Sequence, residues 1–361
     1  MKNYKFAYSD NALLFLVTLA VMFVLSLPAH SQGQGQKNEG LILVGNKSGN
    51  TLSFIDRSTG QTIQKLPTGL QPHEVEVSDD GRWAVVANYG DQDHPGNTLS
   101  LYDVKNLQQV KTIDLGENTR PHGLDWIKGT SRVMVTTEGT RKLLVVDVKQ
   151  EKIVKALDTQ REISHMVAVP PDGKRAFVSS IRSGDVTVFN VPTGERLAQL
   201  YSGKGAEGIA VSPDGKEVWV TNRSDNTITI FDAQSLEQTG QLQCGDFPIR
   251  ARFSPNGKYF VVSNAQSGDV AVFDARQKQL IKKITMRPPV PEDKDPQRYF
   301  SEFEDTSVPI GVVVPDNQTA YVSNTRSDVV TVIDLEGLKI QGHFKAGLEP
   351  DGINYSSITP Q

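Results

Sequence analysis

The sequence predicts an all-β protein, a seven-bladed β-propeller whose blades are four-stranded antiparallel sheets. Three observations predict this fold class. The chain repeats itself at a period of about forty residues, which is typical of propellers and solenoids. A closing Asp or Asn occurs once in each of seven repeats, and the two ends of the chain together make up one complete repeat.

The first strand of each repeat ends in a turn. Segments 164–173, 207–215 and 249–257 each begin with apolar residues in a strand-like pattern and end in Asp-Gly or Asn-Gly. These dipeptides favour a two-residue hairpin turn, because both central residues of that turn need a positive φ. We therefore expect a tight hairpin between the first and second strands.

The later strands of the repeat have end markers of their own. The second strand tends to end in Asn, at Asn46, Asn88, Asn222, Asn264 and Asn324. The third is closed in every repeat by a short polar residue, namely Asp56, Asp103, Asp147, Asn190, Asp232, Asp274 and Asp334. Such side chains can bond the backbone of the following turn. The fourth strand, as in segments 197–201 and 279–284, is more polar, as an outer edge strand should be.

The two ends of the repeat region predict a closed ring. Residues 349–356 look like the opening strand of a repeat that then stops, and residues 41–46 look like the second strand of a repeat without its first. Strands from both ends would complete one blade, and such closure removes the exposed end repeats of an open array. We expect 41–361 to form one propeller domain, preceded by a flexible Gly/Gln linker at 32–40.

Residues 1–31 read as a signal peptide. Lys2 and Lys5 give a positive start, residues 13–27 are almost wholly apolar, and small residues at 29–31 offer a cleavage site. The apolar run is shorter than the roughly 20 residues that span a bilayer comfortably. We expect an exported protein, periplasmic or secreted, with no transmembrane segment after cleavage; an uncleaved anchor is the alternative.

Composition excludes several classes of function. With 38 Lys and Arg against 42 Asp and Glu, the net charge is −4, so no nucleic-acid partner is expected. Cys244 is the only cysteine, which rules out an internal disulfide and a CxxCH haem attachment. No serine-hydrolase elbow, phosphate loop, dinucleotide fingerprint or His-Glu-x-x-His motif occurs. The sequence therefore identifies no catalytic motif, and an enzyme is not the favoured interpretation.

One repeat position is expected to face the central channel. The residues at the start of the seven innermost strands are His73, His122, His165, Glu207, Ile249, Ile310 and Asp351. Three imidazoles with neighbouring carboxylates suit a first-row transition metal, so His73, His122 and His165 are candidate metal ligands, beside Glu207 and Asp351. Protonated imidazoles could instead bind an anion, or the ring could only line the channel.

Two insertions and several basic residues are expected on the same face as the histidines. Segment 89–96, which includes Asp91, Asp93 and His94, lengthens a loop of the second blade, and 287–307 lengthens the connection to the last blade. The short loops of other blades carry Lys47, Arg141, Arg182, Arg223 and Arg326. Long loops on a rigid scaffold often carry function, and a basic rim could attract an anionic ligand. Solvated loops without a ligand are the alternative.

Several segments resemble a known repeat family. Val220-Thr-Asn222, Tyr321-Val-Ser-Asn324 and Ser212-Pro-Asp-Gly215 resemble the YVTN-type β-propeller repeats, over about residues 41–356. That family is similar to the cytochrome d1-like and lactonase-type propellers.

Each resemblance implies a different activity. The cytochrome d1-like resemblance implies a haem at the channel mouth with His73, His122 or His165 as ligand, although this chain has no attached c-type haem domain. The lactonase-type resemblance implies hydrolysis of a sugar lactone by His, Arg and Glu side chains, with His122 and Glu207 as possible counterparts. These propellers host unrelated functions on one scaffold.

We therefore expect an exported binding or interaction propeller that holds a small-molecule or protein ligand on its histidine-bearing face. A metal- or haem-dependent redox protein that uses the three histidines is the first alternative. A lactonase-like hydrolase is the second.

Overall fold

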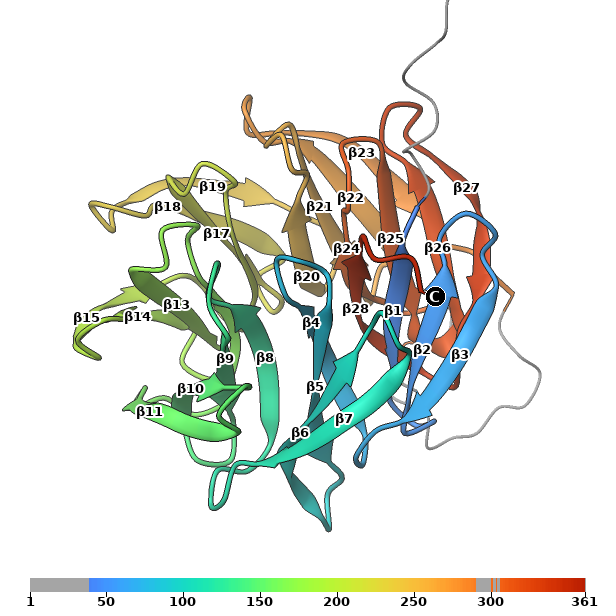
Figure 1. Cartoon of the computed structure of the whole chain (residues 1–361). Helices are drawn as coiled ribbons and strands as arrows, with labels where there is room; N and C mark the ends of the chain where they lie inside the picture. Colours follow the sequence, from blue (N-terminus) through green and yellow to red (C-terminus); the bar gives the residue numbers. More distant parts are fainter. Residues whose placement is uncertain (1–38, 290–299, 301–302, 304–305, 361) are drawn as a thin grey trace, which may run out of the picture. The chain divides into compact units, whose positions relative to one another are not determined.

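The computed structural model describes residues 39–289, 300, 303 and 306–360, all within one compact unit, Lys37–Gln361. These residues form seven four-stranded antiparallel sheets that surround a central axis as the blades of a propeller (Figure 1). The described residues contain no α-helix, only the short 3₁₀ turn η1 (Thr325–Ser327). The predicted fold class is confirmed. The expected signal peptide and nearly all of the expected linker lie outside the described residues.

The blades are numbered from the N-terminal side of the chain, and blade 1 takes its inner strand from the C-terminal end. Blade 1 contains β28 (Pro350–Ser356), β1 (Leu41–Asn46), β2 (Thr51–Asp56) and β3 (Thr62–Pro67). Blade 2 contains β4 (Pro72–Val77), β5 (Trp83–Gly90), β6 (Pro95–Asp103) and β7 (Gln108–Asp114). Blade 3 contains β8 (Pro121–Trp126), β9 (Arg132–Thr137), β10 (Lys142–Asp147) and β11 (Lys152–Asp158). Blade 4 contains β12 (Ser164–Ala168), β13 (Arg175–Ser180), β14 (Asp185–Asn190) and β15 (Arg196–Tyr201).

The remaining blades repeat the same order from the axis outward. Blade 5 contains β16 (Ala206–Val211), β17 (Glu217–Asn222), β18 (Thr227–Asp232) and β19 (Gln238–Gln243). Blade 6 contains β20 (Pro248–Phe253), β21 (Tyr259–Asn264), β22 (Asp269–Asp274) and β23 (Gln279–Thr285). Blade 7 contains β24 (Pro309–Val313), β25 (Thr319–Asn324), β26 (Val329–Asp334) and β27 (Lys339–Lys345).

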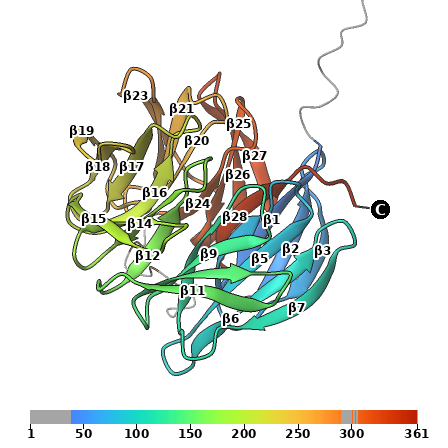
Figure 2. The same ribbon diagram turned by 60° about the vertical axis from the view of Figure 1, so that its left-hand side comes forward.

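Blade 1 closes the ring with strands from both ends of the repeat region. β28 pairs antiparallel with β1, so that Leu41 lies opposite Ser356 and Val44 lies opposite Ile353. Figures 1 and 2 both place β28 beside β1, with β2 and β3 further from the axis. The predicted latch is confirmed, because two paired strands of this blade come from opposite ends of the repeat region.

The core lies between neighbouring blades. The middle strands of each blade are rich in Val, Ile, Leu and Phe and are almost wholly buried, as in Leu143–Val146 of β10. One cluster joins Val85 and Leu101 of blade 2 to Trp126 and Val146 of blade 3. The outermost strands are exposed or half-buried along most of their length, because only one of their faces meets a neighbour. Each blade is therefore stabilised mainly by its two neighbours in the ring.

The hairpin turns occur where expected, but their predicted type is wrong. In the turn after β16, Gly215 has φ +74°, whereas Asp214 is not in the left-handed region. The N–H of Gly215 donates to the carbonyl of Ser212 (2.8 Å), and Asp214 accepts from the Ser212 hydroxyl (2.7 Å). The aspartate is therefore selected for bonding within a four-residue turn, and only the glycine needs a positive φ.

The residue that closes the third strand has the predicted role. Asp56 Oδ1 accepts hydrogen bonds from the backbone N–H groups of Ser58 (2.9 Å) and Thr59 (2.8 Å). Asp232 makes the same pair of contacts with the second and third residues after it. This closing residue fixes the turn into the outer strand.

The two expected insertions differ in what the structure describes. Segment 89–96 does not form a long loop, because β5 and β6 continue into it as an extended hairpin that turns at residues 91–94. Asp91 Oδ1 accepts from the N–H groups of Asp93 (2.9 Å) and His94 (2.7 Å), and this turn is solvated. Much of segment 287–307 lies outside the described residues. No helix among the described residues is long and apolar enough to cross a membrane.

Candidate functional site at the channel mouth

The seven candidate channel residues occupy one equivalent place in the structure. Each is the second residue of an inner strand, namely His73, His122, His165, Glu207, Ile249, Ile310 and Asp351. All seven are 6% exposed or less, so they lie inside the mouth of the channel rather than on its rim. The structure thus brings the three histidines together with Glu207 and Asp351, as the repeat position predicted.

The next position on each inner strand explains which other side chains fill the channel. It is glycine in four strands, at Gly123, Gly208, Gly311 and Gly352. A Cβ at Gly352 would lie 2.1 Å from the carbonyl oxygen of His73, so neighbouring strands approach too closely for a side chain there. Two of the other strands carry charged residues at this position, Glu74 and Arg250, and both are buried.

The three imidazoles pack against one another under a tyrosine. The ring centroids of His122 and His165 are 3.8 Å apart, and those of His73 and His122 are 4.7 Å apart. Tyr89, at the end of β5, covers them, with its ring 4.4 Å from His73 and 5.6 Å from His122. Its hydroxyl donates to Glu138 Oε2 at 2.5 Å. Tyr89 therefore links the imidazoles to a carboxylate that follows β9.

Carboxylates hold two of the imidazoles in place. His165 has Glu138 Oε1 at 2.5 Å from Nδ1 and Glu207 Oε1 at 3.1 Å from Nε2. Burial would lower the pKa of His165, but Glu207 and Glu138 outweigh burial and raise it above the ordinary value. His73 Nδ1 lies 3.0 Å from Asp351 Oδ2, a contact that joins blade 2 to the inner strand of blade 1. Burial and the charge of Lys47 outweigh Asp351 and lower the pKa of His73.

His122, the middle imidazole, has a different environment. Its Nδ1 is buried and has no hydrogen-bond partner among the described residues. Burial lowers the pKa of His122 well below its ordinary value, and the neighbouring His165 and His73 lower it further. A buried ring nitrogen without a partner is costly in a folded protein, so this atom calls for an explanation.

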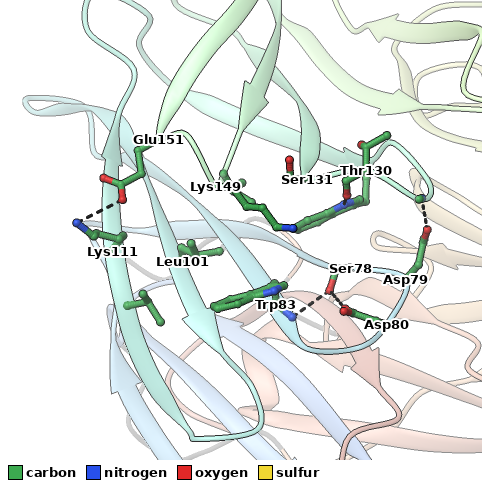
Figure 3. Close-up of a pocket in the computed structure, with 14 residues that line it drawn as sticks. Ser78, Asp79, Asp80, Trp83, Leu101, Lys111, Thr130, Ser131, Lys149 and Glu151 are labelled. Atoms are coloured by element: carbon green, nitrogen blue, oxygen red, sulfur yellow. Dashed lines mark hydrogen bonds and ion pairs between the residues drawn. The ribbon is translucent and has the colours of Figure 1, made fainter.

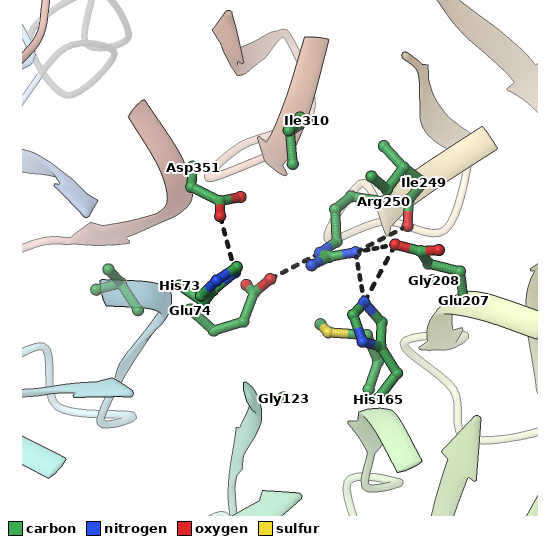
Figure 4. A network of polar contacts seen from close by, with 12 residues as sticks. His73, Glu74, Gly123, His165, Glu207, Gly208, Ile249, Arg250, Ile310 and Asp351 are labelled. Carbon is green, nitrogen blue, oxygen red and sulfur yellow. Dashed lines mark hydrogen bonds and ion pairs between the residues drawn. The ribbon is translucent and has the colours of Figure 1, made fainter. Parts of the chain in front are cut away.

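A buried arginine connects opposite sides of the channel. Arg250 Nε donates to Glu74 Oε1 (2.7 Å), and its Nη1 donates to Glu207 Oε1 (3.1 Å), as Figure 4 shows. Arg223 adds a hydrogen bond to the second oxygen of Glu207 at 2.6 Å. Burial would raise the pKa of Glu207, but His165 and the two arginines outweigh it and lower that pKa to about 2. Blades 2, 5 and 6 are thereby joined across the axis.

Four site residues come from a second repeat position that the sequence analysis did not align. This position directly follows the second strand in six blades and lies within the longer β5 in blade 2, and its residues are Lys47, Tyr89, Glu138, Ile181, Arg223, Ala265 and Thr325. Lys47, Tyr89, Glu138 and Arg223 all belong to the channel-mouth cluster or lie close to its charges. Burial lowers the pKa of Lys47 to about 8, against the opposing effect of Asp351 and Glu349. Aligning this position as well would have predicted Tyr89 and Glu138.

The structure does not bring the other candidate face residues into the site. Arg141 is exposed, and Arg182 forms an exposed ion pair with Glu162 at 2.9 Å. Arg326 donates to the carbonyl of Phe303 at 2.7 Å. These three arginines come one or more residues after the position from which side chains reach the channel. Asp91, Asp93 and His94 form the solvated hairpin turn described above.

The far end of the channel carries a second set of charges that the sequence analysis did not single out. Glu76, Asp125, Arg252 and Asn354 line a cavity of about 360 Å³ there. Burial raises the pKa of Asp125 to about 7, against a hydrogen bond of 2.6 Å from the N–H of Val169. Burial and the nearby Asp125 raise the pKa of Glu76 well above its ordinary value.

The raised pKa of Asp125 predicts that the free energy of unfolding depends on pH. A carboxyl group whose pKa is raised by folding keeps a proton that the unfolded chain releases, so it costs stability as the pH rises from about 4 to about 7. We therefore expect Asp125→Asn to be stabilising relative to the parent at pH 8 and to lose that advantage at pH 4.5. Urea unfolding of both proteins at the two pH values measures the difference. The exposed Asp93→Asn is the control, and an equal effect of Asp125→Asn at both pH values would contradict the prediction.

The geometry of the channel mouth includes one group that could hold a metal ion. His122, Glu138 and His165 each offer a ligand atom, and these atoms lie within 4.8 Å of one another. Two nitrogen donors and one carboxylate make a donor set that first-row transition metals accept. The sequence analysis identified the two histidines of this group but not its carboxylate.

The chain also matches a known protein family. Residues 56–294, more than half of the chain, match the family described as lactonase, seven-bladed β-propeller. The chain belongs to this family. The matching region of this lactonase-family propeller includes His73, His122, His165 and Glu207 and ends before blade 7.

Individual relatives of this lactonase-family propeller are distant. Antigen Lp49 of Leptospira interrogans serogroup Icterohaemorrhagiae serovar copenhageni (strain Fiocruz L1-130) is 26% identical over 143 residues, which cover 38% of this chain. The chain spans only 30% of the length of that antigen.

Two solved structures are similar to the lactonase-family chain in three dimensions. A functionally unknown protein from Desulfotomaculum acetoxidans DSM 771 has a TM-score of 0.73 at 17% identity, covering 89% of this chain and all of its own. A chain of Kuenenia stuttgartiensis hydrazine synthase has a TM-score of 0.68 at 19% identity, covering 82% of this chain and 92% of its own. At such identities the likeness shows the fold alone.

Proposed function

We propose that this chain is an exported binding propeller whose channel mouth holds a first-row transition-metal ion through His122, His165 and Glu138. One observation carries the proposal. His122 belongs to a group of three residues whose ligand atoms lie within 4.8 Å of one another, and its Nδ1 is buried without a hydrogen-bond partner among the described residues. A metal ion bound through Nδ1 would give that nitrogen the partner it lacks. The ligand expected on the histidine face is then the ion itself.

The surroundings of the three donors support the proposal. Metal-binding histidines usually have a carboxylate or carbonyl on the second ring nitrogen, and this partner fixes the orientation of the ring. Glu207 has that position on His165 Nε2, and Asp351 has it on Nδ1 of the neighbouring His73. Tyr89 donates to the oxygen of Glu138 that does not face His165. Each donor except His122 is thus held by a second residue.

A haem is not part of the proposal. A haem iron binds a ring nitrogen and needs open space beside it for the macrocycle, whereas all three imidazoles are 6% exposed or less and lie under Tyr89. An ion needs only small movements of the same side chains.

Membership of the lactonase family favours a second candidate function, hydrolysis of a sugar lactone at the same mouth. A bound ion would supply a Lewis acid for a lactone carbonyl. Arg223 and Lys47 would place positive charge near an anionic sugar, and Tyr89 would have to move to admit it. This candidate needs an opening that the buried histidines do not provide on their own.

The test begins with the metal content of the full chain, expressed with its own N-terminal segment and purified without affinity tags that contain histidine. We expect about one transition-metal ion per chain by mass spectrometry, and a characteristic absorption band when the chelated protein is loaded with Co²⁺. His122→Ala and Glu138→Gln should each weaken metal binding by at least 10- to 100-fold. His94→Ala, in the solvated turn, is the matched control.

The same proteins separate the two candidate functions. Binding without turnover of a panel of sugar lactones supports the metal-binding propeller alone. Turnover that is lost on chelation and in His122→Ala supports the hydrolase as well. Protein that folds normally by circular dichroism but takes up no metal, or takes it up equally well in His122→Ala, would overturn the proposal.

A further inference from the structure

A groove between blades 2 and 3 lies at the end of the strands opposite to the histidines. Trp126 is the last residue of β8, the strand whose second residue is His122, and Trp83 is the first residue of β5. Both tryptophans line a cavity of about 490 Å³, together with Leu101 and Val110. Figure 3 shows Trp83 at one wall, beside the turn that carries Ser78, Asp79 and Asp80. This site is separate from the channel mouth and does not rest on the proposed function.

Tryptophan is concentrated at this one groove. The chain has three tryptophans, and two of them line the cavity. The first residues of the seven second strands are Leu41, Trp83, Arg132, Arg175, Glu217, Tyr259 and Thr319, so only blade 2 places an indole there. The comparable groove between blades 5 and 6 is lined by Phe253 and by charged residues such as Lys216 and Lys278. Packing of the fold therefore does not require the tryptophan pair.

The apolar surface left for a ligand lies mainly on Trp83 and Val110, because Trp126 is only 6% exposed and packs in the core between the two blades. Trp126 Nε1 donates to the carbonyl of Thr130 at 2.7 Å, which satisfies its one polar atom. Arg82 lies over the ring of Trp83 with its guanidinium carbon 5.1 Å from the ring centre. Val110, at 39% exposure, is among the more exposed large apolar residues of the described chain, and it faces the same cavity. Aromatic side chains with this combination are enriched at binding sites.

The edge of the groove carries both hydrogen-bond donors and acceptors. Asp79 Oδ2 accepts from the N–H of Gly129 at 2.6 Å, which ties the turn of blade 2 to the turn of blade 3. Lys111 of β7 and Glu151, in the turn before β11, form an ion pair of 3.3 Å between the same two blades. Lys149 and the hydroxyl of Ser131 also line the cavity. Charged groups thus surround the indoles on several sides.

We propose that this groove binds a pyranose ring of a saccharide. One face of a pyranose consists of C–H groups that pack on an indole, and its edge consists of hydroxyls that both donate and accept hydrogen bonds. The groove presents that combination, and its volume lies in the usual range of small-molecule sites, roughly 300–1,000 Å³. An apolar peptide segment fits less well, because it would bury Asp79, Lys111 and Glu151 without new partners.

The three tryptophans provide the measurement. The full chain is titrated with cellobiose, N,N′-diacetylchitobiose and digalacturonate. Tryptophan fluorescence reports binding at the groove, and calorimetry gives the dissociation constants. At least one disaccharide should bind with a dissociation constant of about 5 mM or tighter. Trp83→Ala should weaken the binding of that disaccharide at least tenfold. Lys149→Ala, an exposed change that leaves folding intact, should weaken it about threefold or more.

Two variants act as controls. Trp219→Phe removes the third, fully buried tryptophan and should leave the affinity unchanged. Lys278→Ala alters the groove between blades 5 and 6 and should also have no effect. The proposal is overturned if none of the three disaccharides binds, or if the parent, Trp83→Ala and Lys149→Ala bind them equally well. It is also overturned if an apolar peptide binds in the groove and the sugars do not.

Discussion

Truncation of the chain after Leu348 is expected to prevent the propeller from folding, not merely to remove its last residues. The change deletes β28, which is the inner strand of blade 1 and pairs along β1. It also removes Ile353, which packs with Ile42 and Val44 in a buried cluster. Losing one buried isoleucine alone costs about 2–5 kcal/mol, and a whole strand costs more than the usual stability margin of about 5–15 kcal/mol can absorb.

Circular dichroism and thermal melting measure this effect. We expect the truncated protein to aggregate, or to show no cooperative transition. A protein that ends at Thr359 is the control, because residue 360 is partly exposed and outside every strand. A truncated protein that melts cooperatively near the temperature of the parent would show that the latch is dispensable.

Arg250→Met is expected to cost about 3–5 kcal/mol of unfolding free energy, the usual cost of removing one partner from a buried ion pair. The guanidinium lies between Glu74 and Glu207, and all three side chains are 7% exposed or less. Methionine has a similar volume but leaves two carboxylates facing each other across the channel without that charge. Urea unfolding of parent and variant gives the difference.

The matched control for this change is Arg182→Met on the protein surface. Arg182 and Glu162 form an ion pair of similar length, 2.9 Å, but their side chains are 69% and 55% exposed. An exposed pair contributes about 0–1 kcal/mol, so this variant should unfold almost like the parent. Equal losses of unfolding free energy in Arg250→Met and Arg182→Met would contradict the prediction that burial makes the Arg250 ion pairs costly to break. Adding Glu74→Gln to Arg250→Met should recover part of the loss.

The repeat pattern predicted the architecture because the fold is built from one unit that recurs. Strand ends, the seven closing residues and the latch follow from hydrophobic alternation and turn residues, which are local properties. The same alignment placed His73, His122 and His165 in one ring, since equivalent repeat positions take equivalent places around an axis. The Asp-Gly turns were misread because a dipeptide suits more than one turn, and Asp214 is selected for its hydrogen bonds.

The remaining site residues could not be predicted in the same way. Glu138 and Tyr89 reach the imidazoles from outside the inner strands, and whether such side chains point inward depends on the closed ring. Arg141 and Arg182 have the same charge as Arg223 and lie in comparable loops, yet only Arg223 contacts Glu207. Arg182 lies one residue, and Arg141 three residues, beyond the position that Arg223 occupies in its own blade. Burial of the pair of Glu74 and Arg250 likewise depends on glycines in the neighbouring strands.

The contacts at the channel mouth differ in how much of the chain they require. His122, Glu138 and His165 lie within 44 consecutive positions, counted from 122 to 165, and belong to two adjacent blades. Asp351 of blade 1 meets His73 of the adjacent blade 2 only when β28 has completed blade 1, and Glu74 of blade 2 meets Arg250 of blade 6 across the axis. During synthesis the three donors emerge long before β28 does. We therefore expect the donor group to form early in folding and the contact of His73 with Asp351 to report that the ring has closed.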